Sequence, residues 1–221
     1  MIEKNTVDGN QQLKKTERVE CFFNGGKINV LFVGNSITRH GPKKEIGWEN
    51  DWGMAATKLE NDYVHVAVKM LEERFGKVNY GIVNCGDWET HYYDDSLIPQ
   101  WQAARDFQAD IVVMRLGENV WNAVDKLKED PLAPHYAKLV EYLSAKPNAK
   151  VLITGLFWDG GDIEKAVESI AVENGYTFVR LCDLSAEKEN MAIGQFWHEG
   201  VALHPSDLGM RRIAERIVAA L

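Results

Sequence analysis

Cysteine is scarce in this chain, and basic residues are outnumbered by acidic ones. The three cysteines, Cys21, Cys85 and Cys182, lie far apart, a spacing that suggests neither a disulfide scaffold nor a zinc knuckle. The net charge of −8 argues against nucleic acid and anionic membranes as partners, because phosphate binding needs a basic face. A reducing, cytoplasmic location fits best, although a secreted protein that had lost its signal peptide would have the same sequence.

Long apolar runs, linkers and repeats are also lacking. No segment approaches the roughly 18 apolar residues of a membrane-spanning helix, and the polar residues 1–20 contain no apolar core of a secretory signal. No linker rich in Pro, Gly or Ser, low-complexity tract or internal repeat divides the chain. We therefore expect a single domain over residues 21–221, preceded by a polar arm, residues 1–20, for which flexibility is one interpretation.

The chain does contain apolar runs that alternate with helical patterns. Five continuous apolar runs are typical of parallel strands buried on both faces: residues 28–33, 80–84, 111–116, 151–156 and 176–181. Helical patterns fill the gaps at residues 64–75, 101–107, 136–143 and 163–173, and a last helix over 208–221 is N-capped by Ser206 or Asp207. This order predicts a three-layer α/β/α sandwich around a five-stranded parallel sheet.

Four short motifs fall on the loops at the edge of this sheet where such folds bind ligands. Ser36 follows the first strand, Gly86 the second and Asn119 the third, and His204 precedes the last helix. Each has an ordinary structural interpretation, as a helix cap, a turn residue, an Asx-turn residue and a surface histidine. In this order they resemble the marker residues of the SGNH (GDSL-like) hydrolases, over nearly the whole chain from about residue 28. The resemblance implies a flavodoxin-like SGNH hydrolase fold and a serine esterase, similar to carbohydrate acetylesterases, that requires no cofactor.

These residue types suit acyl transfer. The hydroxyl of Ser36 becomes a nucleophile when the imidazole of His204 takes its proton. The oxyanion of the tetrahedral intermediate needs preorganised donors, for which we expect the backbone N–H groups of Ser36 and Gly86 and the side-chain amide of Asn119. The nucleophile elbow Gly-x-Ser-x-Gly of α/β-hydrolases is absent. The other histidines lack metal-ligand spacing, so no metal is expected.

The third member of the triad departs from the pattern of the family. The family usually places an aspartate three residues before the histidine, and Val201 occupies that position here. The nearest upstream acid is Glu199, which is the first candidate for orienting His204. Two alternatives stay open: a backbone carbonyl that orients His204 and leaves a Ser–His dyad, or another carboxylate such as Asp183 or Glu118.

Tryptophan placement bears on the substrate. Indole faces pack well on the C–H faces of sugars, so the tryptophans in loops at this edge are predicted to bind substrate, with burial as loop anchors the alternative. They are Trp48, Trp52, Trp88, Trp121, Trp158 and Trp197. The long insertion over residues 39–62 is expected to be ordered and to cover the serine side of the groove.

The predicted function is hydrolysis of small acyl esters, with acetyl as the first candidate, on a carbohydrate through an acyl-enzyme. The expected partner is a small-molecule or oligosaccharide ester. Two alternatives remain: an esterase, lipase or thioesterase for non-sugar acyl substrates, and a catalytically silent carbohydrate-binding relative. The sequence determines neither the sugar, nor the ester position, nor the oligomeric state.

Overall fold

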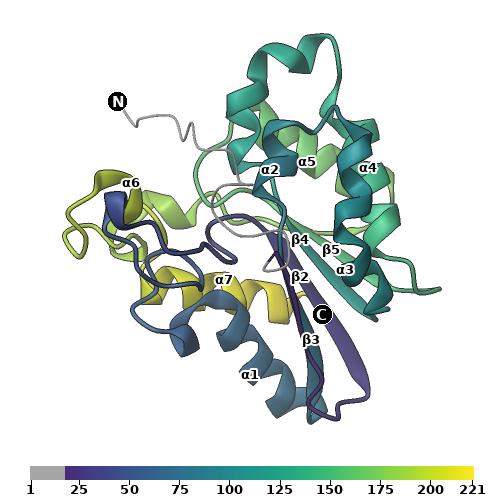
Figure 1. Cartoon of the computed structure of the whole chain (residues 1–221), viewed down its shortest axis with the longest axis horizontal. Coiled ribbons are helices and arrows are strands. Elements are labelled where there is room, and N and C mark those ends of the chain that lie inside the picture. Colours follow the sequence, from purple (N-terminus) through teal and green to yellow (C-terminus); the bar gives the residue numbers. More distant parts are fainter. Residues whose placement is uncertain (1–17) are drawn as a thin grey trace.

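Six strands form one sheet in the computed structural model, which describes residues 18–221 (Figure 1). They are β1 (Val19–Phe22), β2 (Ile28–Gly34), β3 (Val78–Asn84), β4 (Ile111–Arg115), β5 (Lys150–Thr154) and β6 (Thr177–Val179). Their order across the sheet is β1-β3-β2-β4-β5-β6, and only β1 runs antiparallel to its neighbour. The predicted five-stranded parallel sheet is confirmed, with one additional antiparallel edge strand.

The edge strand β1 lies partly inside the segment predicted to be an arm. Val19 pairs with Val83 and Phe22 with Tyr80. The strand has four residues and includes the charged Glu20, so its apolar signal was too short to detect. Residues 1–17 of the predicted arm lie outside the described residues.

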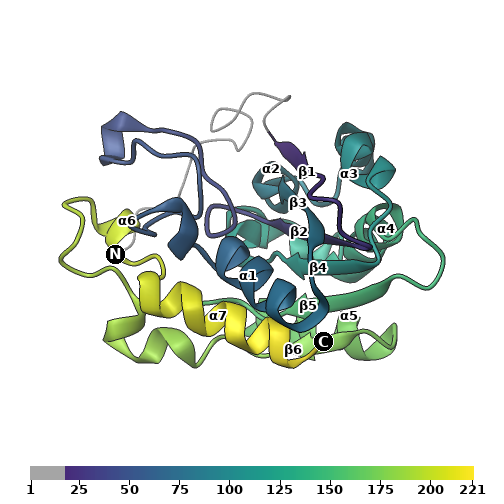
Figure 2. The same ribbon diagram turned by 90° about the horizontal axis from the view of Figure 1, so that it is seen from below.

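The helices cover both faces of the sheet. They are α1 (Tyr63–Phe75), α2 (Gly86–Thr90), α3 (Gln102–Asp106), α4 (Leu132–Leu143), α5 (Asp162–Glu173), α6 (Glu199–Ala202) and α7 (Asp207–Ala219). The neighbouring helices α1 and α7 pack on one face, and α3, α4 and α5 pack on the other (Figures 1 and 2). This arrangement is the predicted three-layer sandwich.

Local capping chemistry sets the ends of the two long helices on the first face. The Asp62 side chain accepts a hydrogen bond from the His65 N–H at the start of α1, which ends at Gly76, whose φ is 76°. The Ser206 side chain accepts from the Gly209 N–H at the start of α7. Of the two caps predicted for the last helix, the structure therefore selects Ser206.

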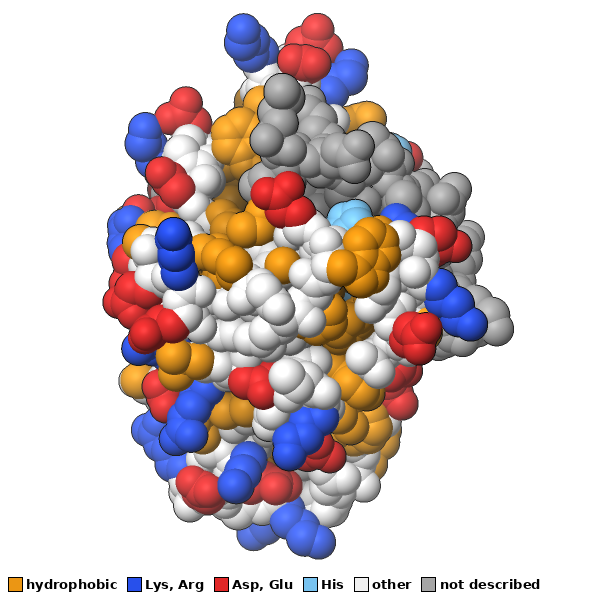
Figure 3. All heavy atoms as spheres, turned by 90° about the vertical axis from the view of Figure 1, so that its left-hand side faces the viewer, with side chains coloured by type: hydrophobic (Ala, Val, Ile, Leu, Met, Phe, Trp, Pro, Cys, Tyr) orange, Lys and Arg blue, Asp and Glu red, His pale blue; other side chains and the backbone are white. Residues whose placement is uncertain are grey.

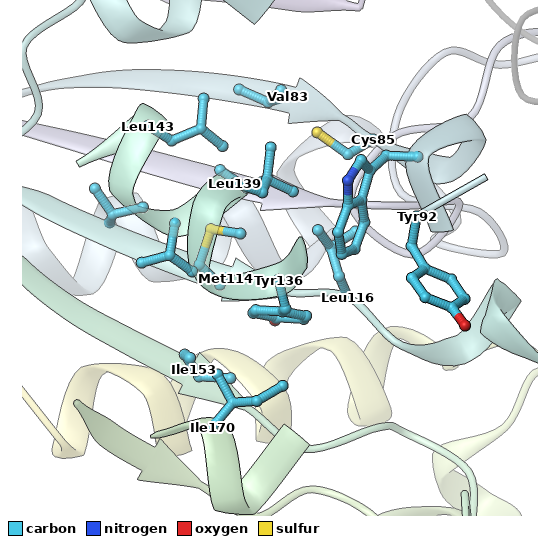
Figure 4. Close-up of a cluster of buried hydrophobic side chains, with 14 of the residues drawn as sticks. Val83, Cys85, Tyr92, Met114, Leu116, Tyr136, Leu139, Leu143, Ile153 and Ile170 are labelled. Atoms are coloured by element: carbon cyan, nitrogen blue, oxygen red, sulfur yellow. The ribbon is translucent and has the colours of Figure 1, made fainter. Parts of the chain in front are cut away.

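The core follows from the pleat of the parallel strands. Successive residues of β2 alternate between the two faces, so that Leu31 and Val33 join one apolar cluster while Val30 and Phe32 join the other. Figure 4 shows the first cluster, in which side chains from β3, β4 and β5 meet those of α4 and α5. Burial on both faces explains why the strands read as continuous apolar runs.

The sheet register brings three strand ends together. Gly34, the last residue of β2, pairs with Asn84 of β3 on one side and with Arg115 of β4 on the other. The loops that follow these strands therefore leave the sheet side by side, at the edge where the sequence motifs were expected to meet.

Candidate active site

Ser36 stands in a tight turn directly after β2. A Cβ on Gly34 would lie 1.9 Å from Thr38 Oγ1, so only glycine fits at the end of the strand. The N–H groups of Thr38 and Arg39 both donate to the Asn35 carbonyl at 2.9 Å, which closes the turn. Ser36 is half-buried, whereas the residues on either side of it are buried. The turn thus presents the Ser36 hydroxyl at the edge of the sheet.

His204 lies against this hydroxyl, as the sequence motifs predict. The Ser36 Oγ is 2.9 Å from His204 Nε2, and His204 Nδ1 is 2.7 Å from the backbone oxygen of Gly200. A carbonyl can only accept, so Nδ1 carries the proton and the lone pair of Nε2 faces the serine. This is the tautomer that a general base needs.

Backbone contacts hold the His204 ring in place. The Ala192 N–H donates to the His204 carbonyl at 2.9 Å, and the His204 N–H donates to Val201 at 3.0 Å. The Trp158 ring meets the imidazole edge-on with 5.3 Å between the ring centroids. Burial lowers the pKa of His204 to about 3, although the Gly200 carbonyl opposes the shift. The imidazole is therefore neutral at neutral pH, the form in which Nε2 has a free lone pair.

The group that orients His204 is a backbone carbonyl rather than Glu199. Glu199 is exposed at the first position of α6, and within residues 18–221 no hydrogen bond or ion pair joins it to the imidazole. Glu118 accepts from Arg115 and Asn35, and Asp183 pairs with Arg216. The predicted role of Glu199 is therefore corrected in favour of the alternative in which a carbonyl leaves a Ser–His dyad.

The residue at the usual acid position serves the fold. Val201 has no exposed surface and joins an apolar cluster with Trp48, Met54, Ala55 and Ala192. The one-turn helix α6 thus places Val201 in apolar packing and the Gly200 carbonyl on His204. The position that carries the acid in SGNH hydrolases here anchors α6 to the insertion.

The three expected oxyanion donors differ in whether they already have hydrogen-bond partners. The Ser36 N–H has no hydrogen-bond partner among the described residues. The Gly86 N–H, at the start of α2, donates to Asn84 Oδ1 at 2.9 Å, so a role as oxyanion donor requires this bond to be shared or broken. The Asn84 side chain is itself held by the Arg39 carbonyl, to which its Nδ2 donates at 2.6 Å.

Asn119 follows β4 and is held by a buried glutamate. Its Nδ2 donates to Glu89 Oε2 at 2.6 Å. The same nitrogen lies 3.9 Å from the place that a Cβ on Gly86 would take, which puts the two predicted donors next to each other. Because a carboxamide carries two N–H groups, one remains for a ligand oxygen after the bond to Glu89.

A buried network beneath these loops escaped the sequence analysis. Asn35 donates to Glu89 at 3.0 Å and to Glu118 at 2.7 Å, and it accepts from Arg115 at 2.8 Å. Arg115 also bonds Glu118 at 2.5 Å. One signal was present, because Arg115 ends an otherwise apolar strand, and a charged residue is rarely fully buried without a partner.

Two of the six tryptophans predicted to bind substrate are wrong assignments. Trp48 and Trp88 have no exposed surface. Trp48 packs against Trp52 and Phe196 and donates to the His40 carbonyl. Trp88 belongs to the core beneath α2. Trp48 anchors the insertion and Trp88 anchors α2 by burial, which was the alternative interpretation.

The other four tryptophans keep some exposed surface. Trp52 is partly buried, and its indole N–H donates to the Ala56 carbonyl. Trp158 is next to His204, and its N–H donates to the Leu203 carbonyl. Trp121 and Trp197 expose 46% and 74% of their surface. Figure 3 shows the end of the molecule that carries α6, where hydrophobic side chains and a histidine lie among charged side chains.

The insertion over residues 39–62 is ordered and anchored next to the serine. The Met54 N–H donates to the Ser36 carbonyl at 2.9 Å. Farther along, Thr57 donates to Asp207 at the start of α7. Its short 3₁₀ turn (Lys44–Ile46) leads into Trp48, which contacts the segment before α6 (Figure 1). That the insertion covers the serine side of a substrate groove stays a prediction.

In residues 18–221, no group of three or more His, Cys, Asp or Glu side chains is arranged to hold a metal ion. The same part of the chain contains no helix of the length and apolarity needed to cross a bilayer.

Comparison with known proteins adds evidence on the fold. No protein-family model matches this chain, and no similar curated protein was found. Among solved structures, one similar protein from Bacteroides uniformis is described as a GDSL-like lipase. It is 17% identical to this chain, the alignment covers 89% of this chain and 96% of the lipase, and the TM-score is 0.58. A family 3 carbohydrate esterase from Clostridium thermocellum has 19% identity, coverages of 87% and 94%, and a TM-score of 0.55. TesA has 18% identity, coverages of 87% and 97%, and a TM-score of 0.52. The chain therefore has the fold of the SGNH (GDSL-type) hydrolases, the family that the order of its motifs resembles.

Proposed function

We propose that this protein is a serine ester hydrolase in which Ser36 is the nucleophile and His204 the general base. The observation that carries the proposal is the pair of contacts of the imidazole, 2.9 Å to the Ser36 Oγ and 2.7 Å to the Gly200 carbonyl. Together they set the tautomer and aim its lone pair at the hydroxyl. A serine that only capped a helix would need no such partner.

The reaction follows from this geometry. His204 Nε2 takes the Ser36 proton as Oγ attacks the ester carbonyl, and the resulting imidazolium then gives its proton to the leaving alkoxide. Water attacks the acyl-enzyme with the same base. The imidazolium is stabilised by the dipole of the Gly200 carbonyl rather than by a carboxylate, so we expect slower turnover than a full triad supports.

Oxyanion stabilisation is proposed for the Ser36 N–H and the second N–H of Asn119. Gly86 joins them when its bond to Asn84 is shared. The loss of one such donor typically lowers kcat by about 10²–10³-fold. Asn119→Ala is expected to fall in this range.

For the substrate we propose a small acyl ester, acetyl first, on a carbohydrate. Trp121 and Trp197 offer exposed indole surface, and Trp158 stands next to His204. The family 3 carbohydrate esterase among the similar structures supports this choice. The GDSL-like lipase among them favours the alternative, a non-sugar acyl ester.

Two measurements test the proposal. Wild-type protein and Ser36→Ala are compared on p-nitrophenyl esters of increasing chain length and on acetylated oligosaccharides, and intact mass is recorded after treatment with a serine-directed organophosphate. We expect cleavage of the acetyl ester, one adduct on the wild type and none on Ser36→Ala. Preference for long acyl chains would favour the lipase alternative. An absence of both hydrolysis and adduct would leave the silent carbohydrate-binding relative as the better account.

A further inference from the structure

Glu89 is a fully buried carboxylate whose contacts are all with donors. It lies in α2 with no exposed surface. Its oxygens accept from Asn119 Nδ2 at 2.6 Å, from Asn35 Nδ2 at 3.0 Å and from the Gly117 N–H at 2.5 Å, with the Asn119 N–H at 3.4 Å. Only the ionised carboxylate can accept all of these bonds.

The contacts of Glu89 determine how the Asn119 side chain is turned. Because the ionised Glu89 can only accept, Nδ2 rather than Oδ1 of Asn119 faces it. Charge-assisted bonds of this length are among the stronger hydrogen bonds in proteins. The same carboxylate binds the backbone N–H of Gly117, so it holds both the side chain and the loop that carries it. Through Asn35 it also reaches the turn that presents Ser36.

We propose that Glu89 is a positioning residue of the oxyanion site. Its carboxylate accepts a hydrogen bond from one N–H of the Asn119 carboxamide, so that the other N–H is presented to the substrate oxygen. The inference rests on the proposed function, since it assumes that Asn119 is an oxyanion donor. Glu89 has no exposed surface, so it acts through Asn119 rather than on the substrate itself.

The surroundings of Glu89 make this support sensitive to pH. The ionisable groups packed around it are Asp87 on its own helix, Cys85 before it, Glu118, Arg115 and Tyr136. Burial, reinforced by the nearby Glu118 carboxylate, raises the pKa of Glu89 to about 7. Protonation would place an O–H donor against these N–H donors, so kcat is expected to fall as the pH drops through this region.

Glu89→Gln is the direct test, with Glu164→Gln as the matched control. Glu164 is also a buried glutamate that accepts from a backbone N–H, at Leu156, but it does not touch Asn119. Glutamine at position 89 must turn an N–H towards one of the donors. We expect kcat to fall about 10–100-fold with KM changed less than about threefold. The acid limb near neutral pH should disappear, and Glu164→Gln should stay within about twofold of the wild type.

A double-mutant cycle shows whether Glu89 acts through Asn119. If it does, Glu89→Gln costs little further kcat in an Asn119→Ala background. An equal penalty in both backgrounds, or a kcat within about twofold of the wild type, would overturn the proposal.

NMR supplies a readout that does not depend on activity. The side-chain amide protons of Asn119, assigned by their loss in Asn119→Ala, should change chemical shift between the wild type and Glu89→Gln, because the bond from Asn119 Nδ2 to Glu89 is altered. Unchanged Asn119 amide shifts in Glu89→Gln would refute the role of Glu89. A wild type that neither hydrolyses p-nitrophenyl acetate nor labels at Ser36 would instead refute the proposed function, and this NMR comparison would still decide the inference.

Discussion

Val201→Asp places an acid where SGNH hydrolases usually carry one, and the structure predicts that the change harms this protein. The Val201 side chain is completely buried among Trp48, Met54, Ala55 and Ala192. Among these side chains, the indole N–H of Trp48 is the one hydrogen-bond donor that could face a carboxylate. It already donates to the His40 carbonyl. A carboxylate at position 201 would therefore be buried without a partner.

The size of the effect follows from burial. Full burial of a valine side chain contributes about 1.5–3 kcal/mol, and an unsatisfied buried polar group costs about 1–3 kcal/mol or more. The expected loss is about 3–5 kcal/mol. Because domains are typically stable by only about 5–15 kcal/mol, Val201→Asp should be severely destabilised.

Urea unfolding and hydrolysis of p-nitrophenyl acetate measure the two consequences. Val172→Asp is the matched control, because Val172 is 69% exposed on α5 and its replacement should change the free energy of unfolding by less than about 1 kcal/mol. A Val201→Asp protein with wild-type stability and a higher kcat would refute the reasoning. It would mean that α6 turns and lets the acid reach His204.

Three further predictions concern His204 and the helices α6 and α7 on either side of it. Glu199→Gln should keep kcat within about twofold of the wild type in the same esterase assay, because Glu199 is exposed and the Gly200 carbonyl orients the imidazole; a tenfold loss would reinstate Glu199 as the acid. Burial lowers the pKa of His204, so below about pH 6.5 the unfolded chain takes up a proton that the folded chain does not. In urea unfolding, the wild type should therefore lose stability relative to His204→Gln as the pH falls. A difference in stability that stays constant with pH would contradict the lowered pKa. Ser206→Ala removes the cap of α7 and the bond to the Glu189 carbonyl, so the free energy of unfolding should fall by about 1–2 kcal/mol, and an unchanged urea midpoint would contradict the role of the cap.

The elements of the fold were predictable because their signals are local. Continuous apolar runs marked the five parallel strands, and helical spacing marked α1 and α7, with Ser206 as one of two candidate caps of the latter. The order of the strands and helices then left few topologies. The edge strand β1 escaped because four residues carry too little periodicity.

Within the site, motif order was enough to predict that Ser36 and His204 lie together, since each is in a recognisable motif at the same edge of a parallel sheet. It ranked Glu199 first as the partner of His204 and kept a backbone carbonyl only as an alternative, because a carbonyl such as that of Gly200 has no side chain by which to be recognised. It also missed Glu89, whose role depends on the packing of α2 against the loop after β4. Likewise, only packing separates the buried Trp48 from the exposed Trp197. Periodicity and motif order are properties of short segments, whereas burial and the pairing of polar groups arise only when distant segments meet. Only the tertiary contacts therefore fix how the His204 ring is oriented and how the Asn119 side chain is held.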